Sequence, residues 1–290
     1  MADTQPTTFT LPGGHRLRYT LTFPGAPERR TILLSSLLAT TAAVWDDIVA
    51  VLHQNGFRVL TYDHPGHGGS TVRTKDLAEN TLDGMADDVY TLVESIGITQ
   101  LHAWIGCSLG SATGVVFAAR HPGVVRRLVV VDTISASPAN AGVADAFSPR
   151  VKALRSGDQT LEAALAQTRE RWLGEEWLTA HPDKRAWLER LMAETTIDGF
   201  ETCIAALLSS QFDLRPLAGT VASSGVERVL VVVGEKDADL PTSMKALADQ
   251  MRDGSGKDIG FHVLPNAGHA SFIDAYGTWL DVVLPFLKDN

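Results

Sequence analysis

Apolar and polar residues follow two patterns that alternate along most of the chain. Short runs that are apolar or strictly alternating predict strands, and they lie at Arg16–Phe23, Ile32–Leu34, Arg58–Tyr62, Leu101–Ile105, Arg127–Val131, Val229–Val233 and Phe261–Leu264. Longer stretches with helical spacing predict helices at Val44–His53, Thr81–Ile96, Ser111–Arg120, Met244–Met251 and Thr278–Leu287. Strands that alternate with helices in this way indicate an α/β fold, with a mostly parallel sheet and helices on both faces.

This alternation breaks between residues 135 and 222, where no strand pattern occurs. Helical spacing there predicts helices at Val143–Leu154, Leu161–Leu173, Lys184–Glu194 and Ile197–Leu208. A helical block between two groups of strands indicates an inserted lid. We therefore expect a core in two parts, residues 1–134 and 223–290, with a helical lid at 135–222. Gly254-Ser255-Gly256 predicts a loop before the last strand.

Composition and charge exclude several classes of protein. The 290 residues are 44% hydrophobic, which is enough for a large core, and the formal net charge of −9 without a basic run argues against nucleic acid as a partner. The two cysteines allow no disulfide framework and no cysteine-rich zinc site. No apolar run reaches the roughly 18 residues of a membrane helix, and the first residues lack a signal-peptide pattern. We expect a cytoplasmic protein without a membrane partner.

A Gly-x-Ser-x-Gly motif occupies residues 106–110, between the predicted strand Leu101–Ile105 and the predicted helix Ser111–Arg120. A serine on such a tight strand-to-helix turn has a strained backbone, and its hydroxyl stands clear of the sheet. Glycines are needed around it because the strand and the helix pass close together. The motif therefore favours Ser108 as a nucleophile, and we expect its neighbour Cys107 to be a small buried thiol.

A serine nucleophile needs a base and a third group that orients the base. His269 follows the last predicted strand, Phe261–Leu264, and Asp237 follows the strand before it. The carboxyl ends of parallel strands share one edge of the sheet, so Ser108, Asp237 and His269 are expected to meet there. Their order along the chain is the one found with this serine motif. Asp239 remains the alternative acid.

Four separated segments resemble the α/β-hydrolase superfamily, and within it 3-oxoadipate enol-lactonases and related lactone and carboxylester hydrolases. The similar segments are Leu33–Asp46, Tyr62–Ser70, Ile105–Thr133 and Val231–Asp237. The resemblance implies the α/β-hydrolase fold and hydrolysis of a small carboxylic ester, above all a lactone, through an acyl-enzyme and without a cofactor. A lyase or perhydrolase-type enzyme without a cofactor, or a small-molecule receptor on the same fold, stays open as an alternative.

The same resemblance implies where an oxyanion hole would form. One donor is the backbone N–H of Leu109, directly after the candidate nucleophile. The other comes from the loop after the strand Ile32–Leu34, at Leu38 or, as the alternative, at Leu37. Relatives usually carry glycine at the next position, where this chain has Ala39.

Two further groups of residues admit more than one interpretation. Asp63, His64 and His67 lie in a glycine-rich turn that could hold a metal ion, but the resemblance implies a structural turn in which His67 holds loop backbone, so no metal site is expected. Three tryptophans fall in the predicted lid, at Trp172, Trp177 and Trp187. They either line the substrate pocket or form the core of the lid.

Overall fold

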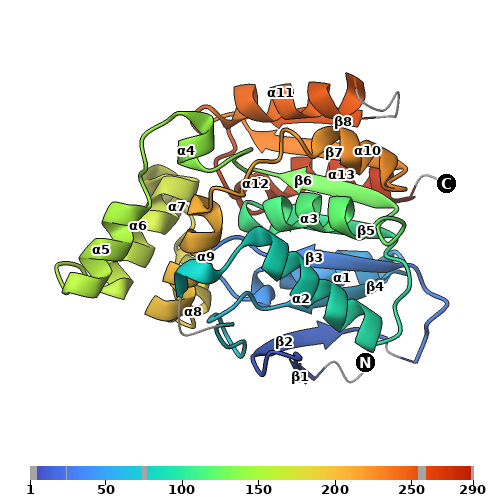
Figure 1. The fold of residues 1–290 in the computed structure, drawn as a ribbon. Coiled ribbons are helices and arrows are strands. Elements are labelled where there is room, and N and C mark those ends of the chain that lie inside the picture. The colour runs from blue at the N-terminus through green and yellow to red at the C-terminus, as the bar shows by residue number, and fades with distance from the viewer. Residues whose placement is uncertain (1–4, 24, 74–76, 254–258, 289–290) are drawn as a thin grey trace.

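A twisted sheet forms the centre of the computed structural model, which describes residues 5–23, 25–73, 77–253 and 259–288 (Figure 1). Its eight strands in the described residues have the order β1-β2-β4-β3-β5-β6-β7-β8. They span Thr7–Thr10 (β1), Arg16–Leu21 (β2), Thr31–Ser35 (β3), Arg58–Tyr62 (β4), Ala103–Cys107 (β5), Arg127–Val131 (β6), Arg228–Gly234 (β7) and Ile259–Leu264 (β8). Strands β1 and β2 pair antiparallel, and the other six run parallel.

Helices cover both faces of this sheet. They span Asp46–Gln54 (α1), Leu82–Ser95 (α2), Leu109–Arg120 (α3), Leu240–Asp253 (α11), Ser271–Asp274 (α12) and Tyr276–Lys288 (α13), with short 3₁₀ helices at Ala42–Trp45 (η1) and Leu77–Glu79 (η2). Helices α2 and α3 pack together on one face (Figure 1). On the other face, Trp45 before α1 stacks on Phe272 of α12, with ring centroids 4.1 Å apart. The predicted mostly parallel sheet with helices on both faces is confirmed.

Local sequence explains where these elements begin and end. Thr81 caps α2 by accepting a hydrogen bond from the Gly84 N–H. Helix α9 (Ile197–Leu208) begins in the same way, because Thr196 accepts a hydrogen bond from the Gly199 N–H. Strands β4 and β6 span the predicted residues, and all their residues are buried, as expected for central parallel strands. Strand β5 begins two residues later than predicted, because Leu101 forms only an isolated bridge with Val125.

The chain between β6 and β7 is helical, and the described residues from 135 to 222 contain no strand. The helices there span Pro138–Ala141 (α4), Ser148–Ser156 (α5), Leu161–Leu173 (α6), Glu175–Ala180 (α7), Pro182–Met192 (α8), Ile197–Leu208 (α9) and Ala218–Ser223 (α10). Helices α5 to α9 form a group beside the sheet (Figure 1). Helix α5 starts five residues after the predicted Val143, which is 62% exposed and contributes no buried face.

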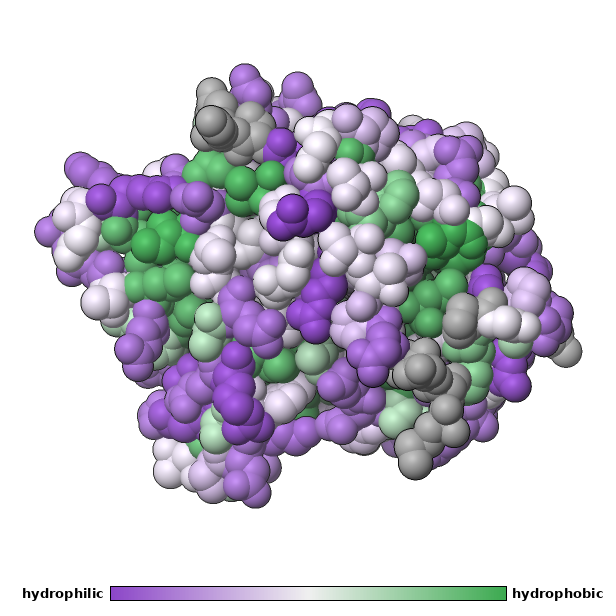
Figure 2. Space-filling model, turned by 90° about the horizontal axis from the view of Figure 1, so that it is seen from below, coloured by the Kyte–Doolittle hydropathy of each residue, from purple (hydrophilic) through white to green (hydrophobic). Residues whose placement is uncertain are grey.

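The surface is mixed rather than dominated by one apolar patch. Seen from below, hydrophobic residues form separate groups among hydrophilic ones (Figure 2). In the described part of the chain, no helix combines the length and apolar character needed to span a bilayer. The predicted loop at Gly254-Ser255-Gly256 lies outside the described residues.

Candidate active site

Ser108 occupies the turn between β5 and α3 in a strained conformation, with φ 53° and ψ −117°. Two glycines make this turn possible. A Cβ on Gly106 would lie 2.3 Å from the Gly110 carbonyl oxygen, and one on Gly110 would lie 2.2 Å from the Ser35 carbonyl oxygen. Both separations are too short for a side chain, so the close passage of strand and helix requires glycine.

Ser108, His269 and Asp237 form one continuous line of hydrogen bonds. The distance from His269 Nε2 to Ser108 Oγ is 2.9 Å, and that from His269 Nδ1 to Asp237 Oδ2 is 2.7 Å. The carboxylate can only accept, so Nδ1 donates to it, and Nε2 of a neutral imidazole is left free to accept the serine proton. Asp239, the alternative acid, is exposed and forms no hydrogen bond or ion pair with His269 among the described residues.

The loop that follows β3 contains the second candidate donor for an oxyanion hole. Within the described part of the chain, the backbone N–H groups of Leu38 and Leu109 have no hydrogen-bond partner. Ala39 has a positive φ of 64°, the left-handed conformation that glycine adopts without strain. Its N–H donates to Nε2 of His67 at 3.0 Å, so the loop keeps this shape without a glycine.

Two buried histidines and an aspartate hold this loop. His64 Nε2 donates to the Ser36 carbonyl at 2.7 Å, and His67 Nδ1 donates to the Pro65 carbonyl at 2.9 Å. Burial lowers the pKa of His64 to about 3 and that of His67 to about 4, so both are neutral near pH 7. The described residues contain no group of three or more His, Cys, Asp or Glu side chains that could hold a metal ion.

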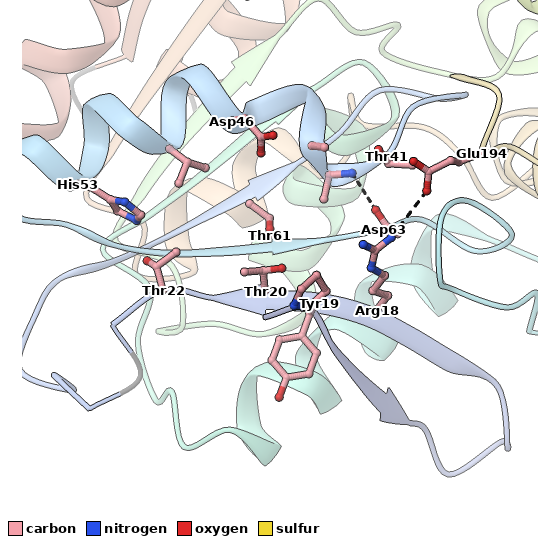
Figure 3. Close-up of a pocket in the computed structure, with 14 residues that line it drawn as sticks. Arg18, Tyr19, Thr20, Thr22, Thr41, Asp46, His53, Thr61, Asp63 and Glu194 are labelled. Atoms are coloured by element: carbon pink, nitrogen blue, oxygen red, sulfur yellow. Dashed lines mark hydrogen bonds and ion pairs between the residues drawn. The ribbon is translucent and has the colours of Figure 1, made fainter. Parts of the chain in front are cut away.

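Asp63 fixes the end of the same loop. Its Oδ1 accepts the N–H of Ala42 at 2.8 Å and its Oδ2 accepts the N–H of Gly69 at 3.2 Å. Arg18 lies 3.5 Å from this carboxylate and 3.7 Å from that of Glu194. Figure 3 shows the group at one end of a pocket of about 290 Å³ between α1 and the strands β2 and β4.

Replacing His67 with glutamine should change how stability depends on pH. The unfolded chain protonates this histidine below about pH 6.5 and the folded chain only below about pH 4, so acidification between these values favours unfolding. From pH 7.5 to pH 5, the wild type should lose about 2 kcal/mol more unfolding free energy than His67→Gln, which has no proton to take up there. Urea unfolding at the two pH values measures this, and equal losses would contradict it.

Comparison with known proteins fits this geometry. Residues 31–276 match the sequence model of a family described as the alpha/beta hydrolase fold. The chain belongs to this family. The structure of this alpha/beta hydrolase superimposes on the enol-lactonase from Burkholderia xenovorans LB400 with a TM-score of 0.83 and 26% identity, covering 98% of this chain and 100% of that one.

Curated relatives give the same family. The chain is 26% identical over 218 residues to 3-oxoadipate enol-lactonase 1 of Acinetobacter baylyi, which is 73% of both proteins. It is 28% identical over 273 residues to the protein named "Putative carbamate hydrolase RutD" of Caulobacter sp. strain K31, covering 91% of this chain and 92% of that one. The predicted resemblance to enol-lactonases is confirmed, and these relatives support a hydrolase.

The three tryptophans between residues 135 and 222 lie in different surroundings. Trp172 is buried against the histidine of the site, with ring centroids 6.2 Å apart, and its carbonyl accepts the N–H of His269 at 2.8 Å. Trp177 stacks on His181, with centroids 4.2 Å apart. Trp187 lines a separate cavity of about 300 Å³ together with Lys184 and Phe272. Of the three, Trp172 is the one whose ring contacts His269.

Asp132 is a residue of the site that sequence analysis missed. It directly follows β6 and is fully buried, with a positive φ of 46°. Its Oδ1 accepts the N–H of Gly234 at 2.8 Å, and its Oδ2 accepts the N–H of Ser271 at 2.9 Å. It therefore ties together the two loops that carry Asp237 and His269. The sequence signal that could have found it is its position directly after a predicted strand, at the sheet edge where the candidate site forms.

Cys107 lies under the site and is fully buried as a free thiol. Burial raises its pKa well above the usual range, and the carboxylates of Asp132, Asp237 and Asp274 add to this effect. A thiol that stays protonated is a poor nucleophile, which favours the neighbouring Ser108 hydroxyl as the candidate nucleophile.

Proposed function

We propose that this alpha/beta hydrolase cleaves carboxylic esters, with lactones as its main substrates, through Ser108, His269 and Asp237. The observation that carries the proposal is the line of hydrogen bonds from the Ser108 hydroxyl through His269 to Asp237. A serine hydroxyl is a weak nucleophile until a base removes its proton, and Nε2 of His269 is 2.9 Å away to do so.

In the first half-reaction, Ser108 Oγ bonds to the carbonyl carbon while His269 Nε2 accepts the hydroxyl proton. The N–H groups of Leu38 and Leu109 stabilise the negative charge on the carbonyl oxygen. The C–O bond then breaks, the leaving alkoxide takes the proton from His269, and an acyl-enzyme remains. Water activated by His269 attacks the acyl carbon and releases the acid and the free serine. These steps require no cofactor.

The preference for lactones rests on the likeness to enol-lactonases over most of the chain. The relative named as a carbamate hydrolase supports a second candidate substrate, a carbamate, since the same serine could attack its carbonyl carbon. A lyase or perhydrolase-type enzyme would keep the same three residues, whereas a receptor would bind its ligand without turnover. The cytoplasmic location stays a prediction.

A panel of lactones, acyclic esters and carbamates, read by proton release, tests the proposal. We expect turnover that is fastest with a lactone, and a burst of alcohol from an activated ester as the acyl-enzyme forms. Fastest turnover of carbamates would favour the second candidate. Aldehyde or peracid production would favour the non-hydrolytic enzymes, and binding without any burst would favour a receptor.

We also propose that residues 135–222 act as a lid that selects the substrate. The support is positional, because Trp172 of α6 contacts His269 and the Gly68 N–H donates to the carbonyl of Glu194 at 3.0 Å. The nucleophile, the base and the oxyanion donors all lie outside this segment. The lid can therefore shape the pocket without taking part in proton transfer.

Replacing Trp172 with alanine should change the ranking of substrates by size. The indole ring is large and lies against His269, so its removal enlarges the space beside the reacting carbonyl. Discrimination between large and small acyl groups should shift by about 10- to 200-fold, while a small activated ester loses little. The kcat/KM values for an ester series measure the ranking, and melting temperature reports packing.

Trp177→Ala and Trp187→Ala are the controls, since those rings pack on His181 and beside Lys184. They should lower the melting temperature without altering the ranking. An unchanged ranking in all three variants would mean that none of these tryptophans lines the pocket.

A further inference from the structure

A second cavity lies at the opposite edge of the sheet from Ser108. Thr31 and Arg58 begin β3 and β4, while His102 and Arg126 directly precede β5 and β6. The amino ends of parallel strands meet at one edge, so these four residues gather there, and they line a cavity of about 190 Å³. Arg29 and Arg30 complete the cationic part of its wall.

This wall carries more positive charge than its surroundings neutralise. Arg126 pairs with Glu227 through Nε–Oε1 at 2.8 Å and Nη2–Oε2 at 3.0 Å. Arg29 and Arg30 instead lie over the rings of Phe23 and Phe57, and among the described residues neither has a carboxylate within ion-pair distance. The excess is local, since the whole chain has a net charge of −9.

The buried position of Arg58 means that this excess positive charge lowers the stability of the folded protein. Arg58 is only 6% exposed, and its Nε donates to Thr31 Oγ1 at 2.8 Å. Within the described residues it has no carboxylate at ion-pair distance. Burial lowers its pKa, and the charge of the more distant Glu28 offsets this effect only in part. A buried cation without a counterion destabilises the folded state. An anionic ligand in the cavity would supply the counterion and so offset this destabilisation.

The buried histidine of this cavity, His102, supplies no negative charge. His102 is buried, with Nε2 2.8 Å from the Leu287 carbonyl and Nδ1 3.2 Å from Arg127 Nη1. Burial, together with the charges of Arg127, Arg30 and Arg126, lowers its pKa to about 4, so it is neutral near pH 7.

We propose that this cavity binds a phosphate group, either as inorganic phosphate or as a monoester of a small molecule. Arg29, Arg30 and Arg58 all line the cavity, and a phosphate offers close to two negative charges and several acceptor oxygens for arginine N–H donors. A single carboxylate would leave most of this charge uncompensated. The site is separate from the catalytic serine and does not depend on the proposed hydrolysis.

Isothermal titration calorimetry with inorganic phosphate and with glycerol 3-phosphate tests the proposal, at constant ionic strength set with sodium chloride. We expect saturable 1:1 binding of at least one of them. Tighter binding of the monoester identifies an organophosphate site, and tighter binding of inorganic phosphate a site for the free ion. Absence of saturable binding of both overturns the proposal.

Arg30→Gln and Arg58→Gln should each weaken binding by about 10-fold or more, the usual effect of losing a charge-assisted hydrogen bond. The matched control is Arg190→Gln, which removes one exposed positive charge on α8, far along the chain from the cavity. If Arg58→Gln does not fold, the exposed Arg30 carries the test. Equal affinity in Arg30→Gln and wild type, or an equal loss in Arg190→Gln, overturns the assignment.

Discussion

Replacing Ser108 with alanine should leave the protein folded and lower kcat by about 10⁶-fold, as loss of a serine nucleophile does in hydrolases with a triad. Ser108 is partly exposed and its hydroxyl hydrogen-bonds to His269 Nε2 at 2.9 Å, so its removal should cost chemistry rather than stability. Alanine keeps the Cβ that Ser108 already accommodates at its φ of 53°. Circular dichroism and initial rates on the best lactone of the panel measure both properties.

The matched control is Cys107→Ala, one residue earlier in the same turn. The thiol is fully buried and its pKa is raised, so this variant should lose stability and keep most of its turnover. Retained activity in Ser108→Ala together with stoichiometric labelling of Cys107 would assign the nucleophile to the thiol instead.

The fold could be predicted from the sequence wherever a segment is buried in a regular way. Strands β4 and β6 lie inside the sheet and are buried throughout, and helices α6 and α9 begin at their predicted residues because Thr160 and Thr196 cap them. Strand β1, Thr7–Thr10, was missed because it is an edge strand with little buried surface. This strand exists because it hydrogen-bonds to β2, and the hydrophobic pattern of its own four residues does not reveal that pairing.

Some residues of the candidate site could likewise be predicted from the sequence, and others could not. Ser108, Asp237 and His269 each follow a strand, and parallel strands end at one edge of a sheet, so their order and spacing along the chain are enough to bring them together. Asp132 binds the N–H groups of Gly234 and Ser271, which lie 102 and 139 positions after it in the chain. No local sequence pattern encodes contacts over such separations. Helical spacing likewise tells which face of α6 is buried, but not that Trp172 of that face meets His269.

Asp132 and Asp237 both follow strands at this end of the sheet, and of the two only Asp237 hydrogen-bonds to the His269 side chain among the described residues. Burial raises the pKa of Asp132 well above its usual range, and the nearby charge of Asp237 raises it further. Both oxygens of Asp132 already accept backbone N–H groups. Asp237, whose Oδ2 is 2.7 Å from His269 Nδ1, is therefore the carboxyl group that the proposed mechanism assigns to orienting His269.

Asp237→Asn should lower kcat by about 10⁴-fold and leave the fold intact, because the amide reverses the hydrogen bond to the imidazole. An asparagine N–H directed at Nδ1 moves the histidine proton to Nε2, and Nε2 can then no longer accept the proton of Ser108. Asp239→Asn is the control, since it removes the same charge two residues later from an exposed side chain and should change kcat little. If Asp239→Asn abolished turnover while Asp237→Asn retained it, Asp239 would be the acid of the triad.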